Sequence, residues 1–134
     1  MEVFTPTIKL EHADARGEIY SITLPGDKEL MLLHSKKGSV RGGHSHDVDE
    51  IVVLLTGAMT YTKKIKRPGE TSGGWREHLR GGDSSRNSMG VFHLAEFPED
   101  SWVLEWKINT TKDGWKNIDD EMWREKVRAN AANA

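Results

Sequence analysis

Two histidines and a glutamate stand at spacings that suit a metal site in the segment from Gly38 to Gly57. His44 and His46 are two residues apart, so on an extended strand both imidazoles leave the same face and can converge on one ion. Glu50 has the same parity and begins a long apolar run. A glutamate in an apolar wall is costly to bury without a cation. The segment therefore predicts three metal ligands on one stretch of chain.

A second segment supplies a further histidine, which a site built on one strand needs in order to close around an ion. Together the two segments resemble the two sequence motifs of the cupin superfamily. The first motif runs Gly, five residues, His-x-His, three or four residues, Glu, six residues, Gly, and it is matched completely from Gly38 to Gly57. The second motif is matched at Gly82, Gly90 and His93, while Ser88 replaces its proline and Phe97 replaces its asparagine.

The cupin resemblance covers roughly residues 14–108 and implies a small all-β jelly-roll barrel with His44, His46, Glu50 and His93 as metal ligands. Three imidazoles and one carboxylate suit one divalent ion per chain, which could be Fe, Mn, Ni, Co or Zn. The chain has no cysteine, so thiolate ligands are excluded. Four protein ligands on an octahedral ion leave two positions open for oxygen atoms of a substrate.

The rest of the sequence indicates many short strands within a single domain, residues 1–134. Residues 18–24 alternate in polarity, a Pro-Gly-Asp turn follows, and residues 29–34 resume the strand, so we expect a hairpin. Further strands are expected over residues 50–56, 59–65, 75–80 and 101–108. On the last of these strands we expect the core to be formed by the face that carries Trp102, Leu104, Trp106 and Ile108.

A helix is predicted only at the C-terminus, over about residues 117–129. Asn117 is the expected cap, and Ile118, Met122, Trp123 and Val127 form an apolar stripe. The last six residues are expected to be frayed. Since the stripe and the strand 50–56, which is apolar at nearly every position, could both be covered by a second copy, we expect a homodimer.

Composition favours an ordinary globular protein, with 36% hydrophobic and 30% charged residues and a net charge of -2. A local basic cluster is expected to be a solvated strand rather than a nucleic-acid footprint; it consists of Lys63, Lys64, Lys66 and Arg67. No apolar stretch is long enough to span a membrane, and the first residues lack the order of a signal peptide. We therefore expect a cytoplasmic protein that binds a small molecule and neither nucleic acid nor membrane.

Three functions fit the sequence. The favoured one is a metal-dependent isomerase, lyase or dioxygenase, in which Tyr61 or His78 moves a proton and Arg41 could contact the substrate. The string from Arg41 to His46 resembles one found in sugar-nucleotide keto-isomerases, which directs the substrate prediction toward sugars or oxo acids. The second function is a metal-free isomerase or epimerase with His44 and His46 as acid and base. The third is a cupin that binds a small ligand without catalysis.

Overall fold

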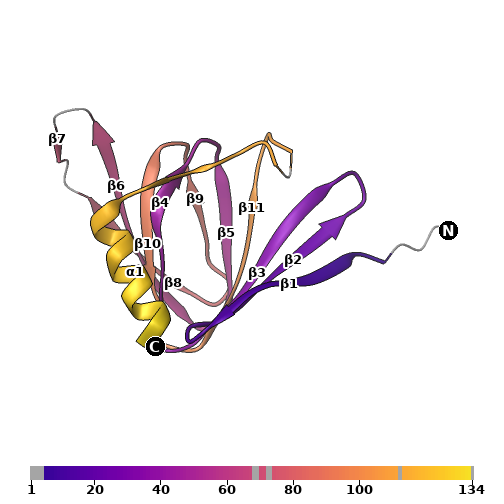
Figure 1. Ribbon diagram of the computed structural model, residues 1–134, viewed down its shortest axis with the longest axis horizontal. Helices are drawn as coiled ribbons and strands as arrows, with labels where there is room; N and C mark the ends of the chain where they lie inside the picture. The colour runs from indigo at the N-terminus through magenta and orange to yellow at the C-terminus, as the bar shows by residue number, and fades with distance from the viewer. Residues whose placement is uncertain (1–4, 68–69, 72–73, 112, 134) are drawn as a thin grey trace.

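The computed structural model describes residues 5–67, 70–71, 74–111 and 113–133. Within this part of the chain, strands account for most of the residues and one helix lies at the C-terminal end (Figure 1). The strands are β1 Thr7–Asp14, β2 Gly17–Leu24, β3 Lys28–Ser35, β4 Val40–His46, β5 Glu50–Thr56, β6 Ala58–Arg67, β7 Glu70–Thr71, β8 Trp75–Arg80, β9 Ser84–Asn87, β10 Val91–Glu96, β11 Ser101–Lys107 and β12 Asn117–Asp119, and the helix is α1 Glu121–Asn133.

The strands form two antiparallel sheets. One sheet has the order β1-β2-β3-β11-β5-β9, and the other has the order β12-β4-β10-β6-β7, with β8 also paired to β6. Side chains from both sheets form the main core: Leu33, Val52, Leu54, Met59, Tyr61, Leu79, Ala95, Phe97 and Val103. The predicted all-β jelly-roll with a short C-terminal helix is therefore confirmed.

Strand β11 presents the opposite face to the interior from the one expected. Trp102 is 37% exposed and stacks on the ring of His34, with ring centroids 4.7 Å apart, whereas Val103 is buried in the core. Alternation separates the two faces of a strand but does not say which one turns inward. Val103 packs in the core between the sheets, and the indole of Trp102 lies on the outer face of β11.

The C-terminal helix starts later than predicted. Residues 117–119 form β12, which pairs with β4 so that Asn117 lies opposite His46. Asp120, not Asn117, caps the helix, because its Oδ1 accepts a hydrogen bond from the backbone N–H of Trp123 at 2.9 Å.

Only part of the predicted apolar stripe is buried. Trp123 and Val127 pack against Val40 and Leu94, whereas Met122 is 81% exposed and Ile118 is also exposed. Since Ile118 belongs to a strand, it does not share the helical period of the other three.

The end of the chain is helical as far as Asn133, where fraying was expected. The side chain of Asn130 ties the helix to the barrel. Its Oδ1 accepts a hydrogen bond from the backbone N–H of Val40 at 2.8 Å, and its Nδ2 donates to the carbonyl of Gly38 at 2.9 Å. These tertiary bonds replace the intrahelical stability that the terminal sequence lacks.

The basic cluster on β6 is not simply solvated. Lys63 is 1% exposed, and its ammonium donates to Ser85 Oγ at 2.6 Å and lies 3.0 Å from a carboxylate oxygen of Glu77. Lys64 and Lys66 both pair with the buried carboxylate of Asp120. The described part of the chain contains no helix long and apolar enough to cross a membrane.

Candidate metal centre

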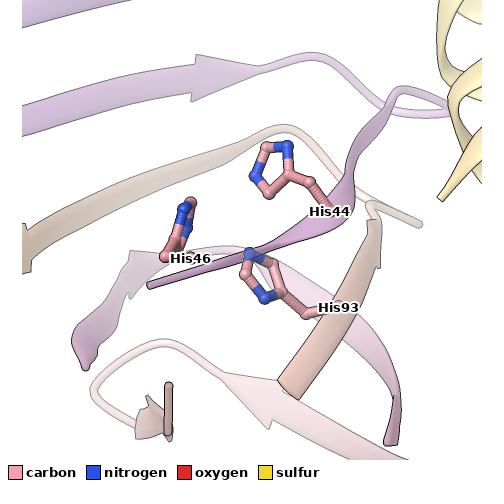
Figure 2. A group of neighbouring side chains, drawn as sticks. All are labelled: His44, His46 and His93. Atoms are coloured by element: carbon pink, nitrogen blue, oxygen red, sulfur yellow. The ribbon is translucent and has the colours of Figure 1, made fainter. Parts of the chain in front are cut away.

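Three of the predicted ligands come together between two neighbouring strands. His44 and His46 lie on β4, and His93 lies on β10 directly opposite His44. The ring centroids are 4.8 Å apart for His44 and His46, 5.1 Å for His44 and His93, and 5.0 Å for His46 and His93. Each residue can offer a ring nitrogen that lies within 4.8 Å of the other two. Figure 2 shows the three rings turned toward a common space.

The close approach of β4 and β10 depends on a glycine. Gly42 has a φ of +91°, and a Cβ at this position would lie 2.7 Å from the carbonyl oxygen of His93. The pairing of the two strands shifts register just after His93. A larger residue at position 42 would push β10 away, so this glycine helps to set the distance between the histidines.

Hydrogen bonds to Nδ1 fix the tautomers of two of the histidines. His46 Nδ1 lies 2.7 Å from the side-chain oxygen of Asn117, and His93 Nδ1 lies 3.2 Å from the carbonyl oxygen of Val91. Amide oxygens only accept hydrogen bonds, so both Nδ1 atoms carry the proton. In a neutral imidazole held in this way the lone pair lies on Nε2, which is the arrangement that second-shell contacts impose on histidines that bind metals.

Glu50 lies beside the two Nε2 atoms and is only 1% exposed. Its Oε2 is 3.2 Å from His46 Nε2, and its Oε1 is 3.8 Å from His93 Nε2. Asn87 Nδ2 donates to Oε1 at 3.0 Å, and the ammonium of Lys107 lies 2.8 Å from Oε2. Burial raises the pKa of Glu50, but the contacts with His46 and Lys107 outweigh burial and hold this pKa below its ordinary value. The carboxylate is therefore ionised next to the histidines.

Two histidines of this cluster are in the form that metals bind. Burial, together with the neighbouring His93 and His46, lowers the pKa of His44 to about 2. Burial likewise lowers the pKa of His93 to about 4, although Glu50 opposes the shift. Both side chains are neutral at neutral pH, as metal coordination requires. Two converging lone pairs, a neutral third imidazole and a carboxylate fit a divalent cation.

The cluster opens onto a cavity of about 260 Å³ between the sheets. Tyr61 lines it, with its ring edge-on to His93 and its hydroxyl accepting a hydrogen bond from Asn87 Nδ2 at 3.0 Å. Burial raises the pKa of Tyr61 well above its ordinary value, so the phenol stays protonated. Arg41 also lines the cavity, as the sequence suggested.

The other histidines lie away from the cavity. His78 is exposed on β8, where its Nδ1 lies 3.3 Å from the hydroxyl of Thr60, and the structure does not bring it to the cluster. His34 stacks on Trp102 and pairs with Glu18, and His12 is exposed beside Asp14.

Several residues of the cavity were missed by sequence reasoning: Arg16, Glu105 and Arg124 line it, and Lys107 lies behind Glu50. Glu105 shares the inward face of β11 with Val103, so the error about that strand also concealed it. Burial, together with the nearby charge of Glu50, raises the pKa of Glu105 to about 7. The signal available was a glutamate between Leu104 and Trp106, a charged residue within an apolar strand.

Comparison with known proteins shows which proteins resemble this chain in sequence and in fold. No family model matches the sequence. A segment of Elongator complex protein 2 from Danio rerio is 27% identical over 116 residues, which are 83% of this chain but only 14% of that protein. The capsular polysaccharide assembling protein CapF from Staphylococcus aureus is similar in structure, with a TM-score of 0.65, 14% identity and coverage of 88% of this chain and 34% of CapF. The chain thus spans about a seventh of the curated relative and about a third of CapF.

Two further solved structures resemble this fold; one is a cupin domain and the other is an enzyme in complex with a metal ion. The cupin domain of Drosophila melanogaster CENP-C has a TM-score of 0.54 and 13% identity, with 75% of this chain and 74% of that domain covered. Hydroquinone 1,2-dioxygenase PnpCD in complex with Cd²⁺ and 4-hydroxybenzonitrile has a TM-score of 0.52 and 14% identity, with 64% of this chain and 60% of that chain covered. The chain has the cupin fold, and the histidine cluster in its cavity could hold a metal ion.

Proposed function

We propose that this chain is a divalent-metal-dependent enzyme that acts on a small, oxygen-rich molecule. The observation that carries the proposal is the convergence of the Nε2 atoms of His46 and His93 on the buried carboxylate of Glu50. His44, His46 and His93 would hold the ion and Glu50 would be the fourth ligand, with Fe, Mn, Ni, Co or Zn as suitable metals. When bound, such an ion supplies a Lewis acid for a substrate oxygen.

Two cavity residues have the properties needed to move a proton near the cluster. The carboxyl of Glu105, with a pKa of about 7, can give or take a proton at neutral pH. Tyr61 keeps its phenolic proton and can donate a hydrogen bond to a substrate oxygen. Proton transfer next to a carbonyl is the central step of isomerases and lyases, so these two classes fit best. Dioxygenation would use the open metal positions without needing Glu105.

The proposal is tested by measuring metal content and metal affinity. We expect elemental analysis of the purified protein to give about one divalent ion per chain, and His93→Ala to remove it. His78→Ala is the matched control, because this exposed histidine lies outside the cavity, and it should bind metal like the unmodified protein. A folded protein that takes up none of the five metals would show the proposal to be wrong.

The two alternative functions predict different results in measurements of turnover and of ligand binding. A metal-free isomerase with His44 and His46 as acid and base would keep its turnover after exhaustive chelation and lose it in His46→Ala. The low pKa of His44 weighs against that role, because such a group holds no proton to donate at neutral pH. A noncatalytic cupin would bind its ligand tightly and release it unchanged.

We also propose that the chain forms a homodimer through its first sheet. Strand β1 is an edge strand that extends away from the barrel with β2 and β3 (Figure 1). Ile8 and Leu10 are exposed on it, at 63% and 53%. An exposed edge strand with apolar side chains can pair with another chain, and a second copy would supply a matching edge.

A further inference from the structure

The cavity contains a buried positive charge that has no partner. Arg41 is almost fully buried on β4. Its Nε donates to Ser35 Oγ at 2.7 Å and its Nη2 donates to the carbonyl of His34 at 3.1 Å, so neutral groups hold the guanidinium in place. Among the residues that the structure describes, no carboxylate oxygen lies within 4.0 Å of it, and Nη1 donates to none of them.

The other two arginines of the cavity are already engaged. Arg16 forms a close pair with Asp14, through both Nε and Nη2, and its Nη1 donates to a backbone carbonyl. Arg124 donates from Nη1 to the carbonyl of Gly42 and has Asp119 at 4.0 Å. Of these three cavity arginines, Arg41 is therefore the one that has no carboxylate oxygen of a described residue within 4.0 Å, whereas Arg16 and Arg124 each have one.

A buried cation of this kind is costly unless an anion joins it. Burial lowers the pKa of Arg41 only to about 10, so the charge persists at neutral pH. A guanidinium has the planar, forked geometry that matches a carboxylate through two parallel hydrogen bonds. The nearby acids Glu50 and Glu105 weigh against a doubly charged anion such as phosphate.

We propose that the cavity binds a small carboxylic acid, such as an oxo acid or a sugar acid, whose carboxylate pairs with Arg41 while its other oxygens face the histidine cluster. This inference rests on the proposed function and specifies its substrate class. The volume of about 260 Å³ agrees with a small acid, because sites for drug-sized ligands usually measure ~300–1,000 Å³.

The test is calorimetric titration of the zinc-loaded protein with matched acids and neutral compounds. D-glucuronate is compared with D-glucose, and pyruvate with pyruvamide. We expect at least one acid to bind about tenfold or more tightly than its neutral counterpart and than inorganic phosphate. Equal binding of the acid and neutral members of both pairs, or tighter binding of phosphate, would overturn the proposal without any variant being made.

Variants of Arg41 test whether its charge is responsible for the preference for acids over neutral compounds. Arg41→Met should weaken binding of the acid by about 10- to 100-fold, as expected when one partner of a buried charge pair is removed. Arg41→Lys keeps the charge but loses the forked guanidinium. Its affinity for the acid should lie between those of the unmodified protein and of Arg41→Met. Arg80→Met is the control, because this arginine is exposed on β8 outside the cavity, and its acid binding should not change.

Two outcomes separate this proposal from the proposed function. If folded Arg41→Met holds one zinc per chain and binds the acid as tightly as the unmodified protein, the carboxylate does not pair with Arg41 and the inference is wrong, while the metal site stands. If the unmodified protein takes up no metal but still prefers the acid in an Arg41-dependent way, the inference stands and the metal-dependent function is wrong.

Discussion

The hydrogen bond between His46 and Asn117 offers the sharpest test of the metal centre, because it acts on the site without removing a ligand. Asn117 Oδ1 accepts the Nδ1 proton of His46 at 2.7 Å. This bond keeps Nε2 unprotonated and holds the ring beside Glu50. In Asn117→Ala all four proposed ligands remain, but the ring of His46 is free to rotate and to change tautomer.

Loss of such a second-shell contact typically weakens metal binding by about 10- to 100-fold, or about 1.4–2.7 kcal/mol. We expect a reduction of that size in Asn117→Ala, measured by competition for zinc with a chelating dye. Asn117→Asp keeps an acceptor oxygen and should retain the affinity. Ile118→Ala, one residue along the same strand, is the control for damage to β12, and thermal unfolding checks the fold of every variant.

The reasoning about the tautomer would be refuted by Asn117→Ala binding zinc as tightly as the unmodified protein while His46→Ala does not bind it. That result would mean that the orientation of His46 is set by packing alone. The ring of Trp115, edge-on to His46 at 5.3 Å, would then be the group that holds it.

Three further predictions concern stability and assembly. Asp120→Ala removes the helix cap and the partner of two lysines, so it should lower the free energy of unfolding by about 1–2 kcal/mol in urea titrations, whereas exposed Glu125→Ala should have little effect. The pKa of Asp120 is lowered from 3.8 to about 2, mainly by contacts that outweigh burial, and the pKa of Asp14 is also lowered. The stabilisation by these two carboxylates is therefore present above about pH 4 and should be lost as the pH falls toward 2, which thermal unfolding measured between pH 2 and 4 would show. Leu10→Lys on the exposed edge should shift a dimer to monomer in sedimentation at micromolar concentration; a monomeric unmodified protein would contradict the dimer.

The sequence determined a large part of this protein by itself. Strand periodicity and frequent turn residues favour a sandwich or barrel of short strands, and the two-residue spacing of His44 and His46 puts their side chains on one face of an extended strand. The motif resemblance added His93 from a segment 47 residues further along, and the structure places it directly opposite His44. These features are local, or depend on motifs that can be recognised from the amino-acid sequence alone.

The tertiary structure decided which faces turn inward and which charges are left without partners. The choice between the Trp102 and Val103 faces of β11 depends on which side chains pack between the sheets, and the same choice places Glu105 in the cavity. Asn117 was expected to cap a helix but holds His46 instead, because β12 pairs with β4. Whether Arg41 is paired or free depends on groups distant in sequence, and burial removes the water that would otherwise compensate its charge.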